Sequence, residues 1–383
     1  MAADAAAAVA ASLGPPGCVA TLILPADVSW SEGAEPVPPA LPQRLAPVPA
    51  ETVERVAKML RSDDPCAILL GGSAVHEEGL RAASRVARAT GAKLLCETFP
   101  ARLERGAGLP AVERLGYLAE FTQAQLAGVR NLVLVDTRAP VSFFAYPGKP
   151  SYLVPDDCEA FGLASGADDV VSALVALGHA VGADEGPVLQ PAARPDRPTG
   201  TLNGETIAAA IGALLPEGAI VSDEANTAGL WLNGATAGAP RHDWLTLTGG
   251  AIGQGLPVAT GAAVACPDRK VLALEADGSA MYTLQSLWTQ VREGLDVTTV
   301  IFNNRSYAIL NLELSRVGAG AGGPKAHDML DLTRPELDFV ALATGMGVPA
   351  FRATTAEQFT TQFEAAMREP GPKLIEAVIP AGF

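Results

Sequence analysis

The sequence predicts an α/β protein with two doubly wound parallel-sheet domains, preceded by a remnant of a third. Short apolar runs alternate with helix-like stretches along most of the 383 residues. This alternation is typical of parallel sheets that helices cover on both faces. Two proline-rich stretches divide the chain, and a hydrophobic content of 49% is enough for more than one core.

The first proline-rich stretch, residues 32–49, is interpreted as an extended linker. Residues 1–31 before it hold an Ala-rich helical pattern and an apolar run at 19–27 that predicts a strand. A middle domain is expected at 50–186. Its predicted strands and helix are, in order, Ala67–Leu70, Glu78–Thr90 (the helix), Lys93–Cys96 and Asn131–Asp136.

A second linker at 187–200 leads to the last predicted domain, residues 201–383. Apolar residues from Met281 to Val291 recur at helical spacing, and they follow an Asp-Gly-Ser turn. The predicted strands of this domain are Ala219–Val221, Val271–Ala276, Val297–Phe302 and Pro372–Ile379.

Composition excludes several classes of partner. The chain has 27 Lys and Arg against 42 Asp and Glu, a net charge of −15, which argues against nucleic acid or an anionic membrane. Five scattered cysteines without a C-x-x-C pair fit a reduced, cytoplasmic setting. The sequence has no basic leader that would indicate a signal peptide. It also has no apolar run of about 18 residues that would indicate a membrane span.

Two predicted strands end in side chains that suit a cation. Asp277 opens the turn Asp277-Gly278-Ser279, and Asn304 follows the next strand. Ligands of open α/β sheets bind at the carboxyl ends of strands, and carboxylate and carboxamide oxygens are ligands that Mg²⁺ takes. A helix start after the turn would offer N–H groups to an anion. A cation with a diphosphate uses all of these features; a plain turn with a capping Asp is the alternative.

The longer pattern resembles the cofactor signature of thiamine-diphosphate-dependent enzymes. Ala276 departs from it, because the family usually has Gly before the Asp. The resemblance implies that Mg²⁺ is held by the side chains of Asp277 and Asn304 and by the backbone carbonyl of Ser306.

Two upstream segments strengthen the resemblance. The Gly-rich segment 248–257 resembles the part of the family that supports the cofactor rings. The Gly250 carbonyl would accept a hydrogen bond from the 4′-amino group, and Ile252 would hold the bent shape of the cofactor. Segment 222–227 resembles one at the diphosphate. The other implied cofactor contacts are Glu224, Asn226, Thr227, Gly278, Ser279 and Tyr307.

After Asn304, residues 305–313 resemble the start of a helix over the substrate pocket, where Ile309 and Leu310 would face a 2-oxo acid. Helix core is the alternative for both. Residues 317–325 are Gly-rich and predict either a lid or a loop. The resemblance implies a decarboxylase or carboligase, a lyase or transferase similar to acetolactate synthase. The Trp–Glu segment that acetolactate synthases usually carry after the paired asparagines is not found here. The alternative is a lyase similar to benzoylformate decarboxylase, although the two active-site histidines of those enzymes cannot be placed in this sequence.

The resemblance covers nearly all of the chain but begins late, because residues 19–27 resemble the last strand of the family's pyrimidine-binding domain. In the family that domain supplies a glutamate that activates the cofactor, and no residue here can be assigned to the role. We therefore expect a pyrimidine-binding domain from a neighbouring chain or a missing segment, and a homo-oligomer. The alternative is a non-catalytic or regulatory paralogue that pairs with a complete enzyme.

A second nucleotide site is not predicted. The Gly71-Gly72-Ser73 turn could hold a phosphate, but the full dinucleotide fingerprint is absent and local packing is the preferred interpretation. The same absence argues against an NAD-type oxidoreductase. Relatives that bind FAD, such as acetolactate synthases, carry it in the middle domain, but the match at 135–138 is weak and FAD is not predicted.

Overall fold

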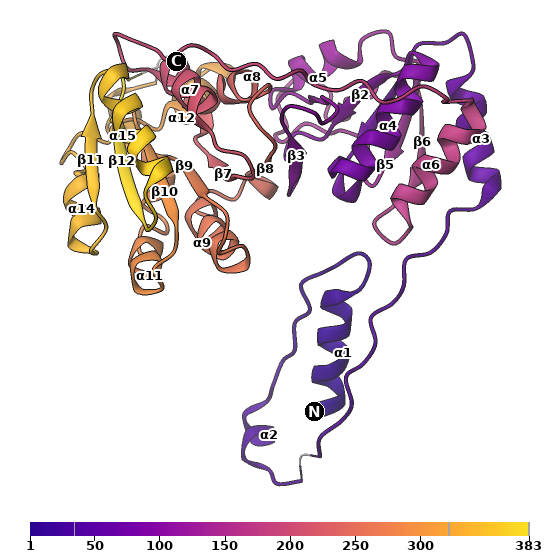
Figure 1. The fold of residues 1–383 in the computed structure, drawn as a ribbon, viewed down its shortest axis with the longest axis horizontal. Helices are drawn as coiled ribbons and strands as arrows, with labels where there is room; N and C mark the ends of the chain where they lie inside the picture. Colours follow the sequence, from indigo (N-terminus) through magenta and orange to yellow (C-terminus); the bar gives the residue numbers. More distant parts are fainter. Residues whose placement is uncertain (34, 321, 382–383) are drawn as a thin grey trace.

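The computed structural model describes residues 1–33, 35–320 and 322–381. Two open sheets form its body, one in the middle of the chain and one toward its C-terminal end (Figure 1). The first has five strands in the order β4-β2-β1-β5-β6, and the second has seven in the order β11-β12-β10-β9-β7-β8-β3. The predicted α/β fold class is confirmed.

The five-stranded sheet is parallel throughout. All five residues of its central strand β1 are buried, as expected where helices cover both faces of a sheet. Helix α6 contacts both α3 and α4. The bounds are α3 (Ala50–Leu60), β1 (Cys66–Leu70), η1 (Gly72–Val75), α4 (Glu77–Thr90), β2 (Lys93–Cys96), β4 (Glu113–Arg114), α5 (Ala119–Leu126), β5 (Asn131–Val135), β6 (Glu159–Ala164) and α6 (Val170–Val181).

The seven-stranded sheet is parallel except at its β3 edge. Its bounds are α7 (Gly204–Leu214), β7 (Ile220–Glu224), η2 (Asn226–Gly229), α8 (Leu232–Ala235), β8 (His242–Leu245), η3 (Thr248–Gly250), α9 (Gly255–Ala265), β9 (Val271–Ala276), α10 (Asp277–Ala280), α11 (Ser286–Arg292), β10 (Val297–Asn303), α12 (Ala308–Arg316), α13 (Pro324–Leu330), α14 (Phe339–Gly345), β11 (Ala350–Ala353), α15 (Ala356–Arg368) and β12 (Lys373–Val378). The helix predicted from Met281 to Val291 is interrupted, because residues 281–285 form turns between α10 and α11.

One strand of the second sheet comes from the middle of the chain. β3 (Leu103–Arg105) pairs antiparallel with β8, with Glu104 opposite Asp243. The sequence predicts one domain over 50–186 and shows no strand at this place, since three residues are too few for a periodic signal. The middle segment therefore contributes to both sheets.

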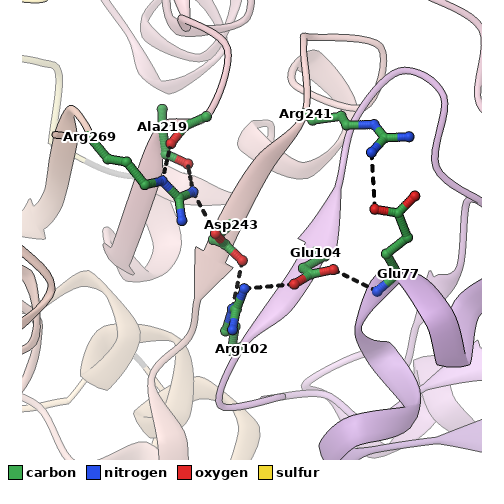
Figure 2. A network of polar contacts seen from close by, with 8 residues as sticks. Glu77, Arg102, Glu104, Ala219, Arg241, Asp243 and Arg269 are labelled. Carbon is green, nitrogen blue, oxygen red and sulfur yellow. Dashed lines mark hydrogen bonds and ion pairs between the residues drawn. The ribbon is translucent and has the colours of Figure 1, made fainter. Parts of the chain in front are cut away.

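Charged side chains extend this junction (Figure 2). Asp243 accepts hydrogen bonds from Arg102 Nε at 2.7 Å and from Arg269 Nη2 at 2.5 Å. Arg102 also donates to Glu104 at 2.6 Å, and the other Glu104 oxygen accepts from the backbone N–H of Glu77 at 2.6 Å. Arg102 and Glu104 belong to the middle segment and Asp243 to the last one, so ion pairs as well as β-pairing join the two.

The N-terminal segment lies outside both sheets (Figure 1). It forms α1 (Ala2–Leu13) and α2 (Ala26–Trp30), and neither helix has a buried residue. The strand predicted at 19–27 is not formed; residues 17–25 have no regular structure. A strand is stabilised by hydrogen bonds to a neighbouring strand, and no strand of the described ranges pairs with this run. Among the described residues, no helix is long and apolar enough to span a membrane.

Candidate active site

Three neighbouring strands bring the predicted site segments together. β10, β9 and β7 are adjacent and parallel in the sheet, so their carboxyl ends lie at the same edge. β7 ends at Glu224, β9 ends one residue before Asp277, and Asn304 follows β10 directly. The sheet edge that the sequence predicts as a ligand site therefore carries these side chains.

Asp277 is a buried carboxylate, and no basic side chain among the described residues pairs with it. Its side chain is 2% exposed, and its oxygens accept hydrogen bonds from the N–H groups of Gly278 at 2.8 Å and Arg305 at 2.6 Å. Burial raises its pKa to about 6, although these backbone hydrogen bonds lower it in part. Because a buried charge needs a partner, the carboxylate is suited to bind a cation.

Asn304 and Ser306 lie on either side of a sharp turn. Arg305 between them has a φ of 58°, and the Asn304 side-chain oxygen accepts from Ser306 N at 3.0 Å. With Asp277 they offer a carboxylate, a carboxamide and a backbone carbonyl, and such oxygen donors fit Mg²⁺. No group of three or more His, Cys, Asp or Glu in the described part of the chain could hold a metal; the predicted ligand set has one such residue.

The predicted diphosphate contacts meet around the Asp-Gly-Ser turn. Asn226 donates to Ser279 Oγ at 2.9 Å, which ties the end of β7 to α10. A Cβ added to Gly278 would lie 2.3 Å from the Tyr307 ring, so this ring packs on the Gly278 backbone. The helix start predicted to bind an anion is short, because α10 has only four residues. One of its N–H groups, that of Gly278, already donates to the Asp277 side chain. Thr227 is half-buried in η2 beside Asn226.

The Gly-rich loop has the backbone that its glycines predict. Gly249, Gly250 and Gly253 have φ values of 67°, 66° and 89°, which other residues rarely adopt. The Gly250 carbonyl accepts from Ile252 N at 3.2 Å in a tight turn. Ile252 is 41% exposed; its contact with a cofactor ring stays a prediction.

The carboxylate of Glu224, predicted as a cofactor contact, is hydrogen-bonded to the Gly-rich loop. Glu224 is 1% exposed, and its carboxylate accepts hydrogen bonds from Gly253 N and from Gly255 N, the latter at 2.6 Å. Burial raises the pKa of Glu224, and the two backbone hydrogen bonds lower it in part. The structure therefore directs this side chain into the Gly-rich loop.

Glu275 is a feature that the sequence analysis missed. It is fully buried in β9, and neither carboxyl oxygen has a hydrogen-bond partner in the part of the chain that the structure describes. A Cβ on Gly255 would lie 2.1 Å from Glu275 Oε1 and 2.8 Å from Glu224 Oε2. Burial, with the Glu224 and Asp223 carboxyls, raises the pKa of Glu275 well above its usual range, which favours the protonated acid. The sequence signal that could have revealed this residue is a glutamate within an otherwise apolar predicted strand, residues 271–276.

The two predicted substrate residues lie on α12, which begins at Ala308. Ile309 is half-buried, and Leu310 lines an apolar cavity of about 370 Å³ between α12 and α13, together with Leu314, Val317, Met329 and Leu330. Neither is fully buried helix core. Their contact with a substrate stays a prediction.

A cavity of about 420 Å³ lies between the middle segment and Gly249. The rings of Phe99, Tyr117 and Phe143 pack together in its wall. Beside it, the carboxylate of Asp136 accepts from Ser73 N at 2.9 Å. The Gly71-Gly72-Ser73 turn is thus packed on a carboxylate, which supports the packing interpretation over a phosphate loop.

Comparison with known proteins identifies the family. Residues 227–377 match the family described as thiamine pyrophosphate enzyme, C-terminal TPP binding domain. The chain is 58% identical over 382 residues to "Putative acetolactate synthase large subunit IlvX" of Mycobacterium tuberculosis. The aligned region covers 99% of this chain and 73% of that protein. It is 33% identical over 178 residues to a benzoylformate decarboxylase of Pseudomonas aeruginosa, and this aligned region covers 46% of this chain and 32% of that protein.

Solved structures agree on the fold. The 4-hydroxybenzoylformate decarboxylase of Rhodococcus jostii, a thiamine-diphosphate-dependent enzyme, superposes with a TM-score of 0.74 at 23% identity, covering 98% of this chain and 73% of that one. A benzoylformate decarboxylase from Polynucleobacter necessarius gives a TM-score of 0.67 at 21% identity, covering 94% and 68%. By its similarity along almost its whole length, the chain belongs to the family of thiamine-pyrophosphate-dependent enzymes related to acetolactate synthase large subunits.

Proposed function

We propose that this chain carries the diphosphate-anchoring half of a thiamine-diphosphate- and Mg²⁺-dependent decarboxylase or carboligase that acts on a 2-oxo acid and is similar to acetolactate synthase. The observation that carries the proposal is the convergence of Asp277, Asn304 and the Gly-rich loop at the carboxyl ends of adjacent strands. This edge is where ligands of open α/β sheets bind.

Each segment has a distinct task in this proposal. Asp277, Asn304 and the Ser306 carbonyl would hold Mg²⁺, which neutralises the diphosphate. Gly250 would accept a hydrogen bond from the amino group of the pyrimidine, and Ile252 would support the rings. Once bound, the cofactor supplies the nucleophilic carbon and the electron sink for cleaving the bond beside the 2-oxo carbonyl. The implied diphosphate contacts are Asn226, Thr227, Gly278 and Ser279.

A second protein surface would complete the site. The activating glutamate is proposed to come from a pyrimidine-binding domain of a neighbouring chain or segment. Several large apolar side chains near the proposed site are exposed: Leu230, Trp231, Ile252, Met281 and Tyr282. Exposed apolar patches mark interaction sites, so these residues support a covering partner and a homo-oligomer.

Two other functions have support. A benzoylformate-decarboxylase-like lyase is supported by the identity to the Pseudomonas aeruginosa enzyme and by the aromatic wall of the larger cavity. A non-catalytic cofactor-binding paralogue that pairs with a complete enzyme would use the same anchoring residues, so their geometry is equally compatible with it. Turnover of pyruvate and of benzoylformate by the complete assembly separates these from the main proposal.

Calorimetric titration with thiamine diphosphate tests the proposal. Binding is expected only with Mg²⁺, and Asp277→Asn should abolish it because the variant removes the charged ligand. Asp268→Asn is the matched control, since Asp268 is an exposed aspartate of the same domain. Binding that is independent of Mg²⁺, or equal in Asp277→Asn and the wild type, would refute the metal assignment.

A further inference from the structure

The end of β7 holds the Gly-rich loop through one carboxylate. Glu224 accepts hydrogen bonds from the N–H groups of both Gly253 and Gly255. Gly255 is the first residue of α9, so its N–H has no acceptor within the helix. Gly253 has a positive φ and lies in the turn before that helix. One buried side chain therefore satisfies two backbone groups that the local structure leaves free.

The Gly-rich loop packs closely against two buried acids at this contact. A Cβ on Gly255 would overlap the carboxyl oxygens of Glu224 and Glu275, so the loop backbone lies directly against the two acids. On the opposite side Thr283 Oγ1 donates to the Gly253 carbonyl at 2.7 Å. That bond fixes a carbonyl but not the two N–H groups.

The loop has further hydrogen bonds at its two ends: Thr248 Oγ1 donates to Gln254 Oε1 and Gln254 Nε2 donates to the Thr246 carbonyl, both at 3.1 Å. Side-chain packing is absent at its two central glycines in the part of the chain that the structure describes. Gly249 and Gly250 have positive φ values, and no heavy atom lies within 4 Å of a Cβ built on either residue. Glycines without such contacts are free to change conformation. The position of Gly250 and Ile252 therefore depends on how firmly the loop is fixed at Gly253 and Gly255.

We propose that Glu224 is a positioning residue that holds residues 249–255 in the conformation that receives the ring end of thiamine diphosphate. The inference rests on the proposed function. Asn226, two residues further along, ties the same strand end to Ser279 in the diphosphate turn. The end of β7 thus sets the distance between the two places where the two ends of one cofactor bind.

Amide hydrogen exchange in the cofactor-free protein tests this role without any turnover. Glu224→Gln keeps the size of the side chain but replaces one acceptor oxygen by an amide donor. The amides of residues 249–255 should exchange about 10-fold faster or more, as expected when a charged hydrogen bond is lost. Amides of β9 and β10 should keep their protection. Glu217→Gln, an exposed glutamate before the same strand, is the matched control.

A result in which loop exchange is unchanged in both Glu224→Gln and Glu224→Ala would overturn the proposal. The Ala variant removes both acceptors, so it covers the case in which glutamine still holds the loop. Uniformly faster exchange in the loop, β9 and β10 would also overturn it, because Glu224 would then only stabilise the fold.

Calorimetry with two probes gives an independent readout. With Mg²⁺ present, Glu224→Gln should bind thiamine diphosphate about 10-fold more weakly than wild type, while inorganic pyrophosphate should bind within about 2-fold of wild type. Equal weakening of both probes would contradict a role confined to the ring end. If the wild type binds neither probe, the proposed function fails, and the exchange experiment still decides the role of Glu224.

Discussion

A single methyl group at Gly278 tests the packing of the predicted diphosphate turn. A Cβ at this position would lie 2.3 Å, 2.8 Å and 3.3 Å from three carbons of the Tyr307 ring. Carbon atoms in contact normally lie about 3.5–4.0 Å apart, so the ring would have to move by more than about 1 Å. Overpacking of this kind costs about 1–3 kcal/mol. We therefore expect Gly278→Ala to lower the free energy of unfolding by that amount.

Urea denaturation is the assay, and Gly261→Ala is the control. Gly261 lies inside α9, and no heavy atom lies within 4 Å of a Cβ built there. Its replacement by alanine should raise the free energy of unfolding by about 0.5–1 kcal/mol, from helix propensity alone. The dependence of unfolding on urea should stay the same in both variants if only stability changes.

A second background isolates the Tyr307 contact. In Tyr307→Ala the ring is absent, so Gly278→Ala should cost less than about 0.5 kcal/mol there. The reasoning fails if Gly278→Ala is as harmless as Gly261→Ala, or if its cost is the same with and without the ring. Either result would mean that Tyr307 does not pack on the turn.

Three further outcomes follow from buried groups. Burial lowers the pKa of His242 to about 4, so below pH 6.5 the unfolded chain binds a proton that the folded chain does not. Stability should fall by about 2–3 kcal/mol between pH 7 and pH 4.5, and urea unfolding of His242→Asn should lack that part of the slope. Asp243→Asn should lower the free energy of unfolding by about 1–3 kcal/mol, whereas Asp268→Asn should not, because Asp243 is buried between Arg102 and Arg269. Burial raises the pKa of the Cys96 thiol to about 12, so iodoacetamide should label the exposed Cys18 and not Cys96 in the native protein, as peptide mass analysis would show.

Much of the fold follows from apolar runs. β1, β9, β10 and β12 match their predicted ranges within one or two residues, because central strands of a covered parallel sheet are apolar on both faces. The nearness of Asp277 and Asn304 follows too, since both come directly after strands that prove adjacent. Pattern and order along the chain are enough for these features.

Features that depend on distant neighbours could not be predicted. β3 is a strand because β8 offers an edge to it. Residues 19–27 have the composition of a strand, but they pair with none in the part of the chain that the structure describes. The helix expected over 281–291 breaks although its spacing is regular. The hydrogen bonds of Glu224 to Gly253 and Gly255 could not be predicted either, because they depend on where the loop after β8 returns to the sheet.

The junction between the two sheets also reaches the proposed site. Arg105 of β3 lies over the Trp244 ring, 5.1 Å from its centre, and Trp244 Nε1 donates to Asp223 at 3.1 Å. Burial raises the pKa of Asp223, while the charge of Arg114, hydrogen bonds from Ala225 N and Trp244, and the charge of Arg105 lower it in part. Asp223 directly precedes Glu224, so the middle segment supplies positive charge to the same strand end that holds the Gly-rich loop. Removing the middle domain would leave Asp223 buried without the charges of Arg114 and Arg105, and we infer that the middle domain stabilises the proposed cofactor half-site through both arginines.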